Sequence, residues 1–217
     1  MPHLTGKMKF SSIEKEAASQ VKSIASQLNS ILKLDSPEVD YKFIKSNCKE
    51  KDLIHFGTYI LYEEFPFNSF RHGRVVLSDN KKEEEEEIEE LEEDLEEEMS
   101  EEASKYPFLS TDRVKELQFD CQVLSIAFCA TKERKIKGEH IIKSVEPYLV
   151  CGSKNVIVPI WIADQSISSH SLNSFYKFLL EGKRPVEAMR SAMLATREKT
   201  NKSFADWAVF SIYGYAL

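Results

Sequence analysis

The chain has 217 residues, of which 42% are hydrophobic and 11% aromatic, which is typical of a globular protein with a substantial core. It contains no run of about 18 apolar residues, and residues 1–19 lack the apolar stretch of a secretory signal, so we expect a soluble protein of the cytoplasm without membrane contact. Its four cysteines form no CxxC pair and no zinc-ligand spacing with histidine, which indicates reduced thiols and neither a metal nor a cofactor.

The net charge of −7 conceals an uneven distribution. Residues 83–102 contain 15 acidic residues and no Lys or Arg, so the remainder has 36 − 15 = 21 acidic residues against 29 basic ones, or +8. The apolar residues of this acidic run are spaced as one stripe of a helix, at Ile88, Leu91, Leu95 and Met99. Like charges four residues apart oppose helix formation. We interpret residues 80–104 as a loop insertion, either solvated or helical only on a basic surface of a partner or of this chain.

Apolar periodicity predicts helices and strands that alternate along the chain. In the first half, helices are predicted at residues 11–33 and 38–47, and strands at 52–59 and 74–78. After the acidic run, the predicted elements are a helix at 110–117, a strand at 121–128, a helix at 138–152 that Pro147 would kink or interrupt, a strand at 155–162, helices at 167–183 and 184–199, and a strand at 206–217. This alternation predicts a layered α/β fold with a mostly parallel central sheet, in one domain over residues 1–217.

Several common catalytic and binding motifs are absent from the sequence. There is no GxxxxGK[ST], GxGxxG, GxSxG or HExxH, which argues against a nucleotide site, a hydrolase elbow and a zinc peptidase. The basic residues do not alternate with aromatic ones as in nucleic-acid platforms, and the acidic run would repel nucleic acid and anionic membranes. We therefore expect protein partners.

Cys129 is the candidate nucleophile. It directly follows the predicted strand 121–128, and the carboxyl ends of strands are where α/β proteins carry their chemistry. The next residues form a polar loop whose cations would favour a thiolate, namely Lys132, Arg134, Lys135 and Lys137. The alternative is that Cys129 is an ordinary small apolar residue at a strand end.

A cysteine nucleophile needs a base, and histidine is the usual one. His55 lies inside the predicted strand 52–59, which is more typical of a hydrogen-bonded core histidine, and Tyr59 shares its face of the strand. His140 lies on the helix after the Cys129 loop. His72 would lie at the amino-terminal edge of the sheet if strand 74–78 is parallel. His3 and His170 have no evident place in a site.

Several segments together resemble one family. DLIHFGTYI is similar to a strand that reads hydrophobic-His-x-Ala-Thr-His-Gly, and CQVLSIAFCAT to one that leads into Leu-Ser-Ala-Cys-x-Thr. IWIAD is similar to Leu-Trp-x-Val-x-Asp, FYKFLLEGKRPVEAMRSAM to Phe-Tyr-x-x-Leu-x-x-Gly followed by a Glu-Ala-Leu-Arg helix, and WAVFSIYG to Trp-Ala-x-Phe-x-x-x-Gly. Over nearly its whole length the chain thus resembles the CHAT domain, a caspase-like cysteine peptidase family related to separases and often joined to tetratricopeptide repeats.

The resemblance implies a caspase-like three-layer sandwich with Cys129 at the position of the nucleophile. The family's catalytic histidine is the second one of its motif, and Tyr59 stands there in this chain, followed by Ile60 in place of glycine. His55 matches the first, non-catalytic histidine. A phenol with a pKa near 10 is protonated at neutral pH and cannot accept the thiol proton.

The resemblance and these departures together predict a catalytically impaired pseudo-peptidase that acts as a protein-interaction or regulatory module. One alternative is an active cysteine endopeptidase in which Cys129 uses His55 or His140 as its base. Another is a non-functional fragment of a larger tetratricopeptide–CHAT protein, because family domains have further strands before the first helix. The resemblance also makes tetratricopeptide-repeat proteins possible partners.

Overall fold

The computed structural model describes residues 10–28, 39–62, 73–77, 108–130, 138–200 and 203–215, and they form a mixed α/β structure as expected. The chain divides into two compact units, one comprising Met1–Ile31 and Ala163–Ala208, the other Leu32–Ile162 and Val209–Leu217. We call these the helical unit and the sheet unit. The acidic run lies outside the described residues, so its role as an insertion at 80–104 of a single domain stays a prediction.

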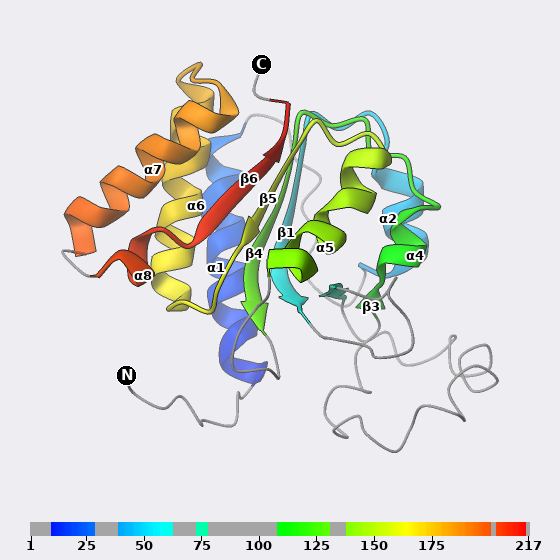
Figure 1. The fold of residues 1–217 in the computed structure, drawn as a ribbon, viewed down its shortest axis with the longest axis horizontal. Helices are drawn as coiled ribbons and strands as arrows, with labels where there is room; N and C mark the ends of the chain where they lie inside the picture. Colours follow the sequence, from blue (N-terminus) through cyan, green and yellow to red (C-terminus); the bar gives the residue numbers. More distant parts are fainter. Residues whose placement is uncertain are drawn as a thin grey trace. The chain divides into compact units, whose positions relative to one another are not determined.

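The sheet unit is built on six strands in the order β3-β2-β1-β4-β5-β6 (Figure 1). The central strands are parallel to one another and comprise β1 (Leu53–Leu61), β4 (Val123–Ala130) and β5 (Asn155–Pro159). The outer strands are antiparallel to their neighbours and comprise β2 (Arg74–Val76), β3 (Phe108–Leu109) and β6 (Phe210–Gly214). Strand β4 is buried along almost its whole length, as its continuous apolar sequence predicts.

The described residues of the sheet unit form the helices α2 (Tyr41–Asn47), α4 (Thr111–Val114) and α5 (Gly138–Val150). Helix α5 packs against the sheet with α4 beside it (Figure 1). It continues through Pro147, although a proline at this position was expected to kink or interrupt the helix. The apolar side of α5 is buried through Ile141, Val145 and Tyr148, and this packing holds the last turn in helical form.

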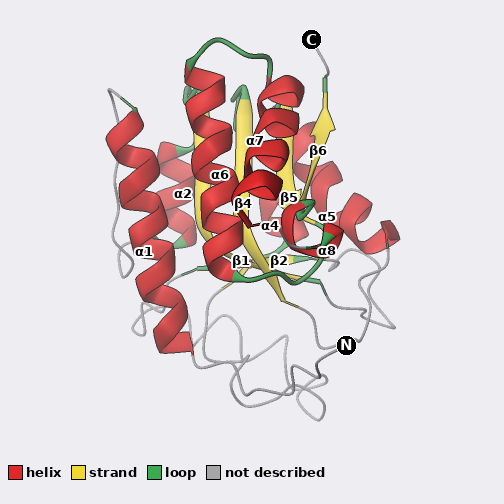
Figure 2. Ribbon diagram, turned by 90° about the vertical axis from the view of Figure 1, so that its left-hand side faces the viewer, coloured by secondary structure: helices red, strands yellow, loops and turns green. Residues whose placement is uncertain are grey.

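The helical unit consists of α1 (Phe10–Gln27), α6 (Gln165–Leu180), α7 (Pro185–Thr200) and the short α8 (Phe204–Trp207), as Figure 2 shows. Local chemistry sets several of these boundaries. The carboxylate of Asp164 accepts a hydrogen bond from the backbone N–H of Ser166 at the start of α6, and Gly182 follows its end with a φ of +88°. Pro185 begins α7. None of the helices in these described ranges combines the length and hydrophobicity that crossing a membrane requires.

Gly73 precedes β2 at a point where no side chain fits. Its φ is +108°, and a Cβ atom there would lie 2.1 Å from Ser144 Oγ and 3.4 Å from Ile60 Cδ1. We expect Gly73→Ala to lower the free energy of unfolding by about 2–4 kcal/mol, because the alanine would be strained and would displace α5. Gly138→Ala is the matched control, since nothing lies within 4 Å of its Cβ position. Urea denaturation of both variants measures the difference, and equal stabilities would contradict the expected contact.

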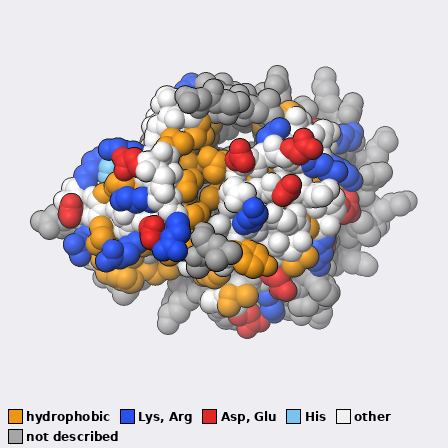
Figure 3. All heavy atoms as spheres, turned by 90° about the horizontal axis from the view of Figure 1, so that it is seen from above, with side chains coloured by type: hydrophobic (Ala, Val, Ile, Leu, Met, Phe, Trp, Pro, Cys, Tyr) orange, Lys and Arg blue, Asp and Glu red, His pale blue; other side chains and the backbone are white. Residues whose placement is uncertain are grey.

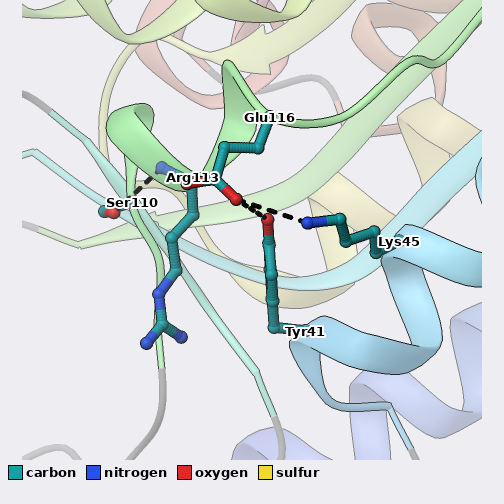
Figure 4. A network of polar contacts seen from close by, with 5 residues as sticks. All are labelled: Tyr41, Lys45, Ser110, Arg113 and Glu116. Atoms are coloured by element: carbon teal, nitrogen blue, oxygen red, sulfur yellow. Dashed lines mark hydrogen bonds and ion pairs between the residues drawn. The ribbon is translucent and has the colours of Figure 1, made fainter. Parts of the chain in front are cut away.

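Tyr41 connects α2 to the segment that follows α4 (Figure 4). Its hydroxyl donates a hydrogen bond of 2.7 Å to Glu116 Oε2, which also lies 3.4 Å from Lys45 Nζ. The guanidinium of Arg113 lies 5.3 Å from the centre of the Tyr41 ring. Burial and the hydrogen bond to Glu116 raise the pKa of Tyr41 to about 12.

The raised pKa of Tyr41 predicts a loss of stability at alkaline pH. Between about pH 10 and pH 12 the unfolded phenol loses its proton while the folded one keeps it, so the unfolded state is favoured as pH rises. We expect Glu116→Gln to lower the pKa of Tyr41, because it removes the negative charge beside the phenol. Ultraviolet absorption titration of wild type, Glu116→Gln and Tyr41→Phe measures this pKa, and an unchanged titration in Glu116→Gln would contradict the role of the carboxylate.

Candidate active-site region

The strand register decides which residue lies beside Cys129. In the β1–β4 pairing, Tyr59 is opposite Phe128 and Ile60 is opposite Cys129, after a shift in register between Phe56 and Tyr59. Cys129 therefore lies inside β4 rather than directly after it, and its neighbour on β1 is Ile60.

Tyr59 and Cys129 point to opposite faces of the sheet. Cys129, Ile60 and Tyr62 belong to one buried apolar cluster that includes the inner side of α5. The rings of Tyr59 and Phe128 instead contact each other, with centroids 5.1 Å apart. Successive side chains of a strand alternate between faces, so the tyrosine at the expected base position is on the other side of the sheet from the thiol.

The environment of Cys129 is apolar. The residue is only 4% exposed, and burial raises the pKa of its thiol to about 12. A neighbouring hydroxyl, that of Tyr62, donates a hydrogen bond of 3.0 Å to the Pro159 carbonyl, and burial raises its pKa as well. Within the part of the chain that the structure describes, Cys129 makes no hydrogen bond to an imidazole and no ion pair. The basic residues expected beside it, in the loop 131–137, lie outside the described residues.

His55 is held by the sheet rather than directed toward the thiol. It is opposite Ser125 in the β1–β4 register, and its Nδ1 lies 2.7 Å from Ser125 Oγ. Burial lowers the pKa of His55 to about 4, so the imidazole is neutral at pH 7. A neutral imidazole can accept a proton in principle, but His55 pairs in register with Ser125, which is four residues before Cys129 on β4.

The lowered pKa of His55 predicts a loss of stability in mild acid. Between about pH 6.5 and pH 4 the unfolded imidazole binds a proton that the folded one does not, so stability decreases as pH falls through this window. We expect this residue to contribute about 1–3 kcal/mol to the change. His55→Gln cannot titrate, and its free energy of unfolding should vary less between pH 7 and about pH 4.5. Identical pH dependence in both proteins would contradict the depressed pKa.

Of the other histidines, the structure describes His140 and His170, and neither makes a hydrogen bond to Cys129. His140 is buried in the first turn of α5, and its backbone carbonyl accepts a hydrogen bond of 2.6 Å from Ser144 Oγ. His170 lies on α6 with its Nδ1 3.2 Å from Lys199 Nζ, and burial and this cation lower its pKa. His3 and His72 lie outside the described residues.

Gly73 and Arg74 are near this region although the sequence analysis did not select them. Strand β2 is antiparallel to β1 and places Arg74 opposite Leu61, at the carboxyl end of β1 and not at the far edge. Arg74 is buried, with its guanidinium 4.3 Å from the centre of the Phe108 ring. The sequence does contain a hint of the antiparallel direction of β2. No helix is predicted in residues 62–73, which connect β1 to β2, whereas a connection between two parallel strands usually contains a helix.

One comparison with known proteins identifies the family of this chain. Among the described residues no group of histidine, cysteine and carboxylate side chains is arranged to hold a metal ion. No curated protein matches the chain. The model of the CHAT domain family matches residues 3–215, which is nearly the whole sequence. The chain therefore belongs to the CHAT domain family.

Proposed function

We infer that this CHAT domain does not hydrolyse peptides and acts as a protein-interaction or regulatory module. Membership of the family supports a caspase-like, peptidase-related domain. The observation that carries the proposal is the state of Cys129, which is 4% exposed with the pKa of its thiol raised to about 12. A thiol in that state is protonated at neutral pH and is a poor nucleophile.

The arrangement around Cys129 supports the same conclusion. Tyr59, at the position of the family's base, is on the opposite face of the sheet, and His55 is bonded to Ser125. Loss of the base from a nucleophile–base pair costs orders of magnitude in rate. A fold that keeps its core but lacks this pair retains its surface for binding, and we propose protein partners in the cytoplasm, with tetratricopeptide-repeat proteins among the candidates.

Peptide turnover tests the proposal directly. The full chain and Cys129→Ala are each incubated with a mixed peptide library, and the products are identified by mass spectrometry. We expect no cleavage product that depends on Cys129. Products formed by the wild type but not by Cys129→Ala would show an active cysteine endopeptidase, and His55→Gln and His140→Gln would then show which imidazole serves as base.

A further inference from the structure

The outward side of α7 combines apolar and basic side chains. Val186 is 42% exposed, Arg190 and Arg197 are exposed, and Met193 and Leu194 are partly exposed. At 100° per residue these positions fall on one side of the helix. The opposite side is the buried one and carries Ala188, Met189, Ala192 and Thr196.

Helix α8 extends this surface with two aromatic rings. Phe204 is 62% exposed and its ring centroid lies 5.6 Å from that of Trp207. The guanidinium of Arg197 lies 5.9 Å from the centre of the Trp207 ring. We call the combined surface the α7/α8 face; it comprises Val186, Arg190, Met193, Leu194, Arg197, Phe204 and Trp207. Figure 3 shows basic, acidic and hydrophobic side chains interspersed over the helical unit.

Two arginines of this face, Arg190 and Arg197, stand against one exposed carboxylate beside them on α7, that of Glu198, which leaves a small positive excess. Arg184 is paired with Glu187 at 2.6 Å, and Asp206 accepts a hydrogen bond of 3.0 Å from the Ser203 hydroxyl. Arg190 makes no ion pair with any residue that the structure describes, and Arg197 contacts an aromatic ring. An occupant that covers the apolar side chains and pairs with both guanidinium groups must itself be apolar on one side and acidic on its flanks.

The acidic run of this chain has that chemistry. Its apolar stripe extends from Ile88 to Met99, or 99 − 88 = 11 residues, and the face on α7 extends from Val186 to Arg197, or 197 − 186 = 11 residues. Eleven residues of a helix extend about 17 Å, so the stripe, if helical, would match the length of the face on α7. Acidic side chains flank the stripe on both sides, where the two arginines of the face would meet them.

We propose that residues 83–102 of a second copy of the chain dock on the α7/α8 face. Both ends of the run are attached to the outermost pair of strands, since Val76 of β2 is paired with Phe108 of β3 and β3 is the last strand of the sheet. The described residues on either side of the run are therefore neighbours at the outer edge of the sheet. This inference rests on the proposed interaction role and names the partner as the chain itself. Each copy offers one acidic run and one face, so association is head-to-tail or closes as a reciprocal pair.

Two complementary variants test the docking. In the first, residues 83–102 are replaced by a Gly/Ser linker of the same length, which keeps the α7/α8 face. In the second, Arg190→Glu with Arg197→Glu reverses the charge of the α7/α8 face and keeps the acidic run. By analytical ultracentrifugation we expect the wild type to self-associate with concentration, each variant to remain monomeric, and an equimolar mixture of the two to form a 1:1 complex. Added salt should weaken every complex.

A matched charge reversal serves as the control. Lys49→Glu with Lys51→Glu changes the net charge equally at exposed positions of the sheet unit and should leave self-association unchanged. A labelled peptide of residues 83–102 should bind the linker variant, and about tenfold more weakly when Arg190 and Arg197 are also reversed. Circular dichroism and urea unfolding show whether each variant is folded.

Three results would overturn the docking. In the first, the wild type is monomeric at all concentrations and the peptide fails to bind. In the second, the wild type is monomeric but the peptide binds the linker variant, which would mean that the chain's own run occupies the face. The arginine variant could also self-associate like the wild type. None of these results bears on Cys129, so peptide turnover and docking fail or succeed separately.

Discussion

Cys129 of the folded chain will react with iodoacetamide at neutral pH at least about 50-fold more slowly than the same thiol in the unfolded chain. Burial raises its pKa from 9.0 to about 12, which lowers the thiolate fraction roughly a thousandfold. A more basic thiolate is also more nucleophilic, with a Brønsted coefficient of about 0.4–0.5, so part of this loss is recovered. Burial of the sulfur slows the reaction further, because only 4% of the residue is exposed.

Time-resolved alkylation with peptide mapping by mass spectrometry measures this rate at each cysteine separately. Cys151 provides an internal comparison, since it is the one cysteine of the four that is partly exposed. We expect Cys151 to be modified first, and Cys129 only as the chain opens. Rapid modification of Cys129 at neutral pH, at a rate that His55→Gln or His140→Gln abolishes, would contradict the buried, unactivated thiol.

Restoration of the family's residues at the strand end will destabilise the protein without activating it. Ile60 is fully buried and belongs to the same cluster as Cys129, so Ile60→Gly removes a core side chain and adds backbone freedom to β1. We expect Tyr59→His with Ile60→Gly to lower the free energy of unfolding by about 3–5 kcal/mol. The new imidazole would replace a ring that contacts Phe128, on the face opposite the thiol.

The single variant Tyr59→His separates the two effects, because it places the imidazole without opening the core at Ile60. Cys129 should be alkylated no faster in the folded single variant than in the wild type, at any pH between about 6 and 8. Should either variant gain alkylation of Cys129 that follows an imidazole titration, the β1–β4 register described here would be wrong at its carboxyl end.

Much of the fold follows from local sequence. The continuous apolar run at residues 121–128 predicts a central buried strand, and β4 occupies Val123–Ala130. The boundaries of α6 and α7 follow from Asp164, Gly182 and Pro185, whose effects on a helix end are local. The predicted strand at 206–217 was too long, because Ser203 and Asp206 form a capping box and residues 204–207 are helical.

The surroundings of Cys129 depend instead on pairing between distant segments. The register shift between Phe56 and Tyr59 is a property of two strands together, and it decides that Ile60 rather than Tyr59 lies beside the thiol. The antiparallel direction of β2 brings Gly73 against Ser144 of α5, a contact that periodicity in either segment cannot reveal. The sequence thus identified the strand ends that matter but not the faces to which their side chains point.

The protonation state of the Cys129 thiol tests the central conclusion most directly. In protein labelled with carbon-13 at the cysteine Cβ atoms, the Cβ chemical shift of each residue reports the ionisation of its thiol, and the Cys129→Ser spectrum assigns the signal. With a pKa of about 12, the Cys129 shift should stay constant from about pH 6 to about pH 10. A titration near or below neutral pH would show an activated thiolate and contradict the account of this chain as a CHAT domain without a functional nucleophile.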